Sequence, residues 1–131
     1  MSGGPGRLYR VVAVLTALSG ASLIVLGALS AHRLEGTAQH LCDSGLRYQA
    51  WHTLALLAVL LAGADRWQWW RAVCVLWTVG TALFSGSLYI MAATGWRLGL
   101  VTPCGGLVLM AGWLWLARQW WCLTRCSRVQ E

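Results

Sequence analysis

Four stretches without a charged residue follow one another along the chain, at residues 11–31, 48–64, 72–96 and 98–117. A helix needs about 20 apolar residues to cross the roughly 30 Å of bilayer hydrocarbon, so only the second stretch is marginal and is expected to extend into its flanks. Arg97 alone separates the last two, which predicts a tight turn and a fourth helix that begins around Thr102 and Pro103. The pattern predicts an all-α fold: an integral membrane antiparallel four-helix bundle that forms one domain over residues 1–131, with short tails.

Composition agrees with a membrane location. Hydrophobic residues make up 58% of the chain and charged residues 11%, against about a quarter charged in an ordinary soluble domain. All ten basic residues are arginines, and the formal net charge is +6. The arginines stand between apolar runs and form no patch, so the charge gives no reason to expect nucleic-acid binding. Ten tryptophans suit the membrane interface, and the lipid bilayer is the expected surrounding.

The arginines also predict an orientation. Seven lie on the side of the bundle that holds the two termini: Arg7, Arg10, Arg66, Arg71, Arg118, Arg125 and Arg128. Arg33, Arg47 and Arg97 lie on the other side. The positive-inside rule then places both termini in the cytoplasm of a bacterial inner-membrane protein, with a loop at residues 32–47 on the outer face. A cleaved signal peptide is the alternative for the first stretch, but its 21 residues exceed the roughly 7–15 of a signal core.

Small residues fall at spacings of three and four along one face of the first stretch: Ala17, Gly20, Ala21, Gly27 and Ala28. Such faces let helix backbones approach closely in lipid, where no hydrophobic effect drives helices together. Gly80 and Gly86 in the third stretch, and Gly105 and Gly106 in the fourth, are further expected packing positions.

The acidic residues argue against transport and catalysis. All four are expected in loops or at the terminus: Glu35, Asp43, Asp65 and Glu131. Ion-coupled transporters and proton relays place an ionisable group within the membrane, and a catalytic histidine needs a carboxylate to orient it. The sequence therefore predicts a protein that is not an enzyme.

His52 is the one titratable side chain clearly inside a predicted span. It could pair with His32 as a metal or haem ligand, or it could form a hydrogen bond with a neighbouring helix. The second interpretation is favoured, because buried polar groups in lipid must find partners and no CxxCH or HExxH motif is present. Ser85, Ser87 and Tyr89 could share a polar pocket with His52, or their hydroxyls could bond to nearby carbonyls. No metal and no cofactor are expected.

Five cysteines give no metal-binding pattern. Cys42 and Cys104 are both expected on the outer side, where an oxidising compartment would allow a disulfide between them. The other three are expected on the inner side, in the reduced state.

Four segments carry a resemblance to a known family. They are GALSAH at residues 27–32, YQAWHTLALL at 48–57, LFSGSLY at 83–89 followed by Thr94 and Gly95, and LGLVTPCGG at 98–106. Their order and spacing resemble the signature of the domain-of-unknown-function family 423, small four-span proteins of bacterial inner membranes with animal relatives called transmembrane protein 256. The chain differs at Ser30, where glycine is usual, and at Cys104, where an aliphatic residue is usual. The resemblance implies a four-helix membrane protein and supplies no activity.

The polar residues of these spans are expected to form one cluster beneath the outer headgroups: His32, Tyr48, Gln49, His52, Ser85, Ser87, Tyr89 and Thr102. The leading interpretation is a structural or accessory subunit that packs against a larger inner-membrane complex or forms a homo-oligomer. The alternative is a binding module whose polar cluster holds a lipid, a quinone or a haem.

Overall fold

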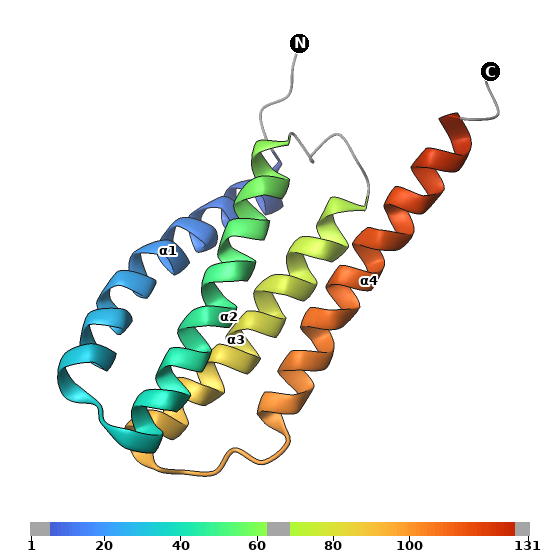
Figure 1. Cartoon of the computed structure of the whole chain (residues 1–131). Helices are drawn as coiled ribbons and strands as arrows, with labels where there is room; N and C mark the ends of the chain where they lie inside the picture. Colours follow the sequence, from blue (N-terminus) through green and yellow to red (C-terminus); the bar gives the residue numbers. More distant parts are fainter. Residues whose placement is uncertain (1–5, 63–68, 128–131) are drawn as a thin grey trace.

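The computed structural model describes residues 6–62 and 69–127, with side chains described up to Cys122. It contains four helices: α1 (Arg7–Arg33), α2 (Gly36–Leu61), α3 (Trp70–Thr94) and α4 (Val101–Ser127). They run alternately up and down, so that α1 begins and α4 finishes at the same end of the bundle (Figure 1). The described part of the chain has no strand, and the predicted all-α bundle is confirmed. The predicted end of the second span at residue 64, and the residues Asp65, Arg66, Arg128 and Glu131, lie outside the described residues, as does the side chain of Arg125.

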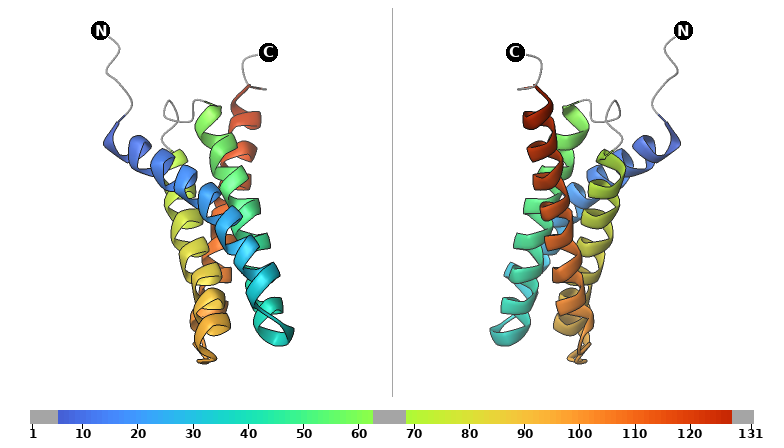
Figure 2. Two further views of the ribbon diagram at one scale, coloured as in Figure 1. Left: turned by 90° about the vertical axis from the view of Figure 1, so that its left-hand side faces the viewer. Right: turned by 90° about the vertical axis from the view of Figure 1, so that its right-hand side faces the viewer.

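The helices pack in the order α1, α2, α3, α4. Most contacts are between neighbours in this order, and α1 touches α3 only slightly. Figure 2 shows α1 crossing the other helices obliquely. All four helices contribute to the core, α1 through Val12, and Val73, Cys74 and Trp77 of α3 are fully buried in it. The closest backbone approach is between α3 and α4, since a Cβ at Gly105 would lie 2.5 Å from the backbone nitrogen of Phe84.

The small face of α1 is largely open within this chain, so its expected role in packing against another helix stays a prediction. Ala17, Ala21 and Ala28 are exposed, and a Cβ at Gly20 or Gly27 would meet nothing within 4 Å. The helix instead turns its hydroxyl-bearing side inward, because those hydroxyls bond to α2.

Two of the glycines expected at helix contacts on α3 and α4 also lack a close neighbour. A Cβ at Gly86 would meet nothing within 4 Å, and one at Gly106 would make only ordinary contact with the Phe84 ring, at 3.6 Å. The tight contacts are at Gly45, Gly80, Gly105 and Gly112, of which Gly80 and Gly105 were among the expected packing positions.

The largest difference from the expected boundaries is at the start of α2. The helix begins at Gly36, whereas the sequence predicted a loop until residue 47, and the link between α1 and α2 is reduced to two residues. Gly36 has φ of +56°, a conformation that glycine adopts without strain, and it lets the chain turn there. The loop prediction was wrong because Cys42 and Gly45 are buried against neighbouring helices, and this packing outweighs the polar character of the segment.

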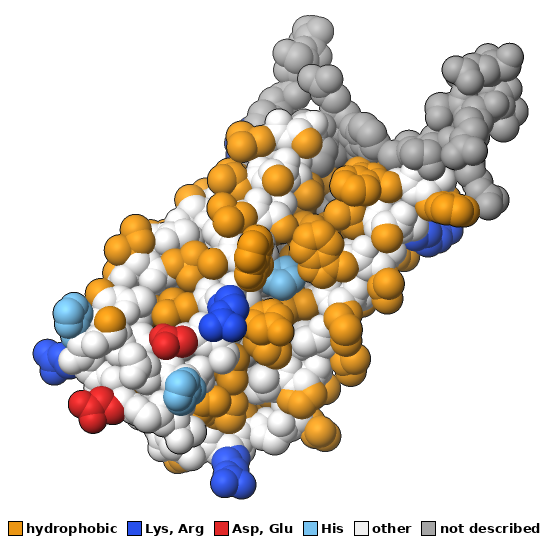
Figure 3. All heavy atoms as spheres, in the orientation of Figure 1, with side chains coloured by type: hydrophobic (Ala, Val, Ile, Leu, Met, Phe, Trp, Pro, Cys, Tyr) orange, Lys and Arg blue, Asp and Glu red, His pale blue; other side chains and the backbone are white. Residues whose placement is uncertain are grey.

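Within the described ranges, three helices are long and apolar enough to cross a membrane by length and composition: α1, α3 and residues Val101–Cys122 of α4. The helix α2 is not among them: its body carries Asp43 and Arg47 on the surface, and Gln49, His52 and Thr53 buried inside the bundle. Apolar side chains cover most of the surface in Figure 3, and most charged side chains lie toward the ends of the helices. Most of the outward surface therefore suits lipid.

Candidate functional site

The expected outer polar cluster is divided into separate groups that lie deeper in the bundle. Because α2 begins at Gly36, the segment from Tyr48 to His52 lies in the middle of the helix and not at its outer end. His32 is exposed at the end of α1 and takes part in none of these groups. The Tyr48 ring is partly exposed and packs against the Phe84 ring, with 4.5 Å between centroids.

Gln49 is the centre of the largest group and joins three helices. Its Nε2 donates to the hydroxyls of Ser19 (3.0 Å) and Ser22 (2.8 Å) and lies 3.1 Å from the Ser19 carbonyl oxygen. Its Oε1 accepts a hydrogen bond from the Tyr89 hydroxyl at 2.7 Å. Tyr89 reaches Gln49 over Gly45, where a Cβ would lie 2.7 Å from the tyrosine ring. Gln49 therefore holds α1, α2 and α3 in one register.

A second group connects α3 to its other neighbours. The Ser85 hydroxyl donates to the Gly45 carbonyl at 2.8 Å, and this bond is buried. Ser87 lies 2.6 Å from the Thr102 hydroxyl and also donates to the Phe84 carbonyl. These hydroxyls thus bond both within their helix and across to the next one.

His52 contacts α4 and is not bonded to Gln49. Its Nδ1 lies 2.7 Å from the Tyr48 carbonyl oxygen, and the Trp113 indole donates to its Nε2 at 3.1 Å. A carbonyl oxygen only accepts, so Nδ1 carries the proton, Nε2 is the acceptor and the ring is neutral. The Trp77 ring packs edge-on against the imidazole, with 6.0 Å between centroids. Both ring nitrogens are therefore occupied, and the pairing with His32 is not formed.

The described residues contain no group of three or more His, Cys, Asp or Glu side chains that could hold a metal ion. The thiols of Cys42 and Cys104 are both free. Cys42 is buried in α2, in a region lined also by residues of α1 and α3, while Cys104 is exposed on α4. The expected disulfide is absent because α2 and α4 are not adjacent in the bundle at these positions.

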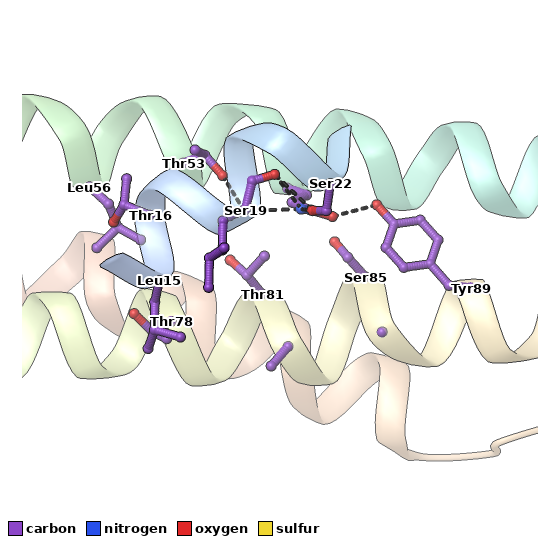
Figure 4. Close-up of a pocket in the computed structure, with 14 residues that line it drawn as sticks. Leu15, Thr16, Ser19, Ser22, Thr53, Leu56, Thr78, Thr81, Ser85 and Tyr89 are labelled. Atoms are coloured by element: carbon purple, nitrogen blue, oxygen red, sulfur yellow. Dashed lines mark hydrogen bonds between the residues drawn. The ribbon is translucent and has the colours of Figure 1, made fainter. Parts of the chain in front are cut away.

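A pocket of about 380 Å³ lies between α1, α2 and α3 (Figure 4). Nine of its fourteen lining residues carry a hydroxyl or an amide, and no lining residue is charged. The hydroxyl oxygens of Thr78 and Thr81 are buried at its wall without a hydrogen-bond partner. The sequence pattern showed Thr81 one turn before Ser85, but neither threonine was among the expected site residues, and Ser19 and Ser22 were also missed.

Asp43 and Arg47, which were expected in a loop, lie one turn apart on the body of α2 and are both exposed. Asp43 accepts a hydrogen bond from the Ser30 hydroxyl of α1 at 2.6 Å. Arg47 forms no salt bridge within the described part of the chain.

These features define an integral membrane protein of the all-α class, with its polar side chains bonded inside the bundle and a predominantly apolar surface. The chain belongs to the family described as "Protein of unknown function (DUF423)", whose model matches residues 26–106.

Proteins named as membrane proteins are among its relatives. The chain is 41% identical over 112 residues to the UPF0382 inner membrane protein YgdD of Escherichia coli (strain K12). This alignment covers 79% of this chain and 84% of the relative. It is also 41% identical over 108 residues to a UPF0382 membrane protein of Haemophilus influenzae, with 79% and 87% covered. The UPF0382 membrane protein SH2409 of Staphylococcus haemolyticus is 36% identical over 117 residues, with 82% and 92% covered. No solved structure matches the chain.

Proposed function

We propose that this protein is an accessory subunit of a larger complex in a bacterial inner membrane, and that it binds its partner through the outer face of α2. The observation that carries this proposal is Arg47, an exposed charged side chain on the body of a helix whose surroundings are apolar. Charged residues within membrane segments are rare and usually face other protein groups.

The contacts of α2 give the depth of Arg47. Asp43 is level with Ser30, three residues before the end of α1, because the two side chains are hydrogen-bonded. Arg47 is one turn, about 6 Å, deeper along α2. Gln49 is level with Ser19, close to the middle of α1. An arginine that faces hydrocarbon at the centre of a span costs about 2.5–3.5 kcal/mol, and a partner that offers acceptors there lowers this cost.

The rest of this face is apolar and bordered by two grooves. Trp51, Leu54 and Leu61 are between 60% and 78% exposed. A groove of about 510 Å³ lies on the side of α4, and one of about 520 Å³ lies on the side of α1. The open positions Ala17 and Gly20 of α1 line the second groove, where small residues allow another helix to approach. The face therefore combines a charged anchor with room for a partner helix.

The seven-to-three distribution of arginines supports an orientation with both termini in the cytoplasm. In that orientation Asp43 and Arg47 lie toward the outer half of the membrane. Both ring nitrogens of His52 are in hydrogen bonds, so neither is left to act as a base or an iron ligand. This supports a role without catalysis and without haem.

Co-purification tests the proposal. The tagged full chain would be extracted from its native membranes in a mild detergent and separated on native gels, with mass spectrometry of the larger species. We expect Arg47→Gln to reduce the complex about tenfold, because a charge-assisted hydrogen bond contributes about 1.5–3 kcal/mol. Arg97→Gln, which removes a charge from the turn between α3 and α4, should leave the complex unchanged. Equal recovery with both variants, or a larger species that contains only this chain, would contradict the proposal.

A further inference from the structure

The pocket between α1, α2 and α3 has features of a binding site, and its position is separate from the face proposed for a partner. Gln49, Thr53 and Leu56 of α2 line it, and they lie on the opposite side of that helix from Arg47 and Trp51. The pocket opens where α1 and α3 hardly touch, beside the exposed side chains of Leu15, Leu18 and Ala82. It can therefore be entered from the lipid phase.

Most polar groups in this pocket already have partners. Both amide protons of Gln49 are donated to α1, and the Tyr89 hydroxyl is donated to Gln49. Thr16 donates to the Val12 carbonyl, one turn earlier in its own helix. The hydrogen bonds of these groups hold the helices of the bundle together, so few donors are left for a ligand.

Thr78 and Thr81 are different, because their buried hydroxyls have no partner. They are three residues apart and so lie on one face of α3. Across the pocket, Ser19 and Thr53 share one hydrogen bond of 2.7 Å, which leaves one of their two hydroxyl protons for another acceptor (Figure 4). Donors without a partner thus lie on both sides of the pocket. The covered hydroxyls of Thr78 and Thr81 would turn about χ1 to reach a bound acceptor, which removes the free-energy cost of leaving them unpaired.

We propose that the pocket binds a quinone, an uncharged ring with carbonyl oxygens on opposite edges. Carbonyl oxygens accept hydrogen bonds and donate none, which matches the free hydroxyl protons of Thr78 and Thr81. No charged side chain lines the pocket, so nothing there would balance a phosphate or a carboxylate. The volume of about 380 Å³ is within the range of about 300–1,000 Å³ for small-molecule sites.

The depth of the pocket favours a quinone over the ester carbonyls of a bilayer lipid. The hydrogen-bonded level of Ser19 and Gln49 is near the middle of α1, whereas lipid esters lie in the interfacial region at the edge of the hydrocarbon. An uncharged ring can occupy the hydrocarbon region with its isoprenoid chain in the lipid. The tail would leave the pocket through the opening between α1 and α3.

Saturation binding of radiolabelled decylubiquinone to the purified full chain in phosphatidylcholine nanodiscs tests this proposal. We expect saturable binding that Thr78→Val and Thr81→Val each weaken by roughly 3- to 10-fold, the loss of one hydrogen bond. Gly86→Leu should weaken it more than 10-fold, since position 86 lines the pocket and its Cβ meets nothing, so the added side chain fills the site without a clash. Thr37→Val makes the same hydroxyl-to-methyl change on an exposed turn and should leave the affinity unchanged.

Thermal melting of each variant shows whether the bundle is intact. Absence of saturable binding to the wild type, or equal affinity in the wild type and in a folded Gly86→Leu variant, would overturn the proposal. Displacement of decylubiquinone by an equal concentration of dioleoylglycerol would also overturn it and identify an ester lipid as the occupant. The assay uses this chain alone, so its failure is distinguishable from failure of the accessory role.

Discussion

The hydrogen bonds of Gln49 lead to a quantitative prediction for the stability of the bundle. Gln49→Leu removes bonds to Ser19 and Ser22 of α1 and to Tyr89 of α3 while keeping a side chain of similar size. Hydrogen bonds between membrane helices contribute about 0.6 kcal/mol on average and at most about 1.7. For three bonds we expect the free energy of unfolding to fall by about 2 kcal/mol.

The measurement is reversible unfolding in mixed micelles with increasing dodecyl sulfate, followed by helicity. Gln39→Leu provides the matched control, because it makes the same change on the same helix at a partly exposed position. Its effect should stay within about 0.5 kcal/mol. Combining Gln49→Leu with Tyr89→Phe should give less than the sum of the two separate losses, because both variants remove the same bond. Strict additivity, or a loss for Gln49→Leu no larger than that of the control, would refute the reasoning.

Two further predictions concern His52 and the topology. His52→Leu should lower the free energy of unfolding by about 1 kcal/mol in the same assay, because it leaves the indole N–H of Trp113 unpaired. His52→Gln should lower it by less than half as much. Equal losses for the two variants would contradict the hydrogen-bonding role of His52. An impermeant maleimide should label Cys104 from outside intact cells and reach Cys122 only after permeabilisation, since both thiols are exposed and lie toward opposite ends of α4. The reverse labelling pattern would show that the protein has the opposite orientation in the membrane.

The sequence predicted the fold class because the information is local. Apolar runs of sufficient length separated by arginines define membrane helices without reference to their neighbours. The start of α4 at Val101 is close to the expected Thr102 and Pro103 for the same reason, since proline is well accommodated in the first turn of a helix. Local signals failed at residues 36–47, where the helix depends on packing that only the folded bundle provides.

The polar contacts were harder to predict because they depend on which helix faces which. A periodic signal was nevertheless present in α1, where Thr16, Ser19, Ser22 and Ser30 follow one side of the helix, beside the stripe of small residues. The small face attracted the packing interpretation, whereas hydrogen bonding placed the hydroxyl side inward. In lipid a hydroxyl-bearing stripe is therefore the stronger indicator of the buried side of a helix than a stripe of small residues.

The hydrogen bonds that hold α1 to the bundle also affect access to the proposed quinone site. Apolar packing alone does not draw helices together in lipid, and α1 touches α3 only slightly. Hydrogen bonds that involve Tyr9, Ser19, Ser22 and Ser30 attach α1 to α2. Displacement of α1 about these bonds would widen the α1–α3 opening without disturbing the contact between α3 and α4. Weakening the Gln49 contacts should therefore accelerate both entry and release of decylubiquinone, whereas removing Thr78 or Thr81 should accelerate release alone.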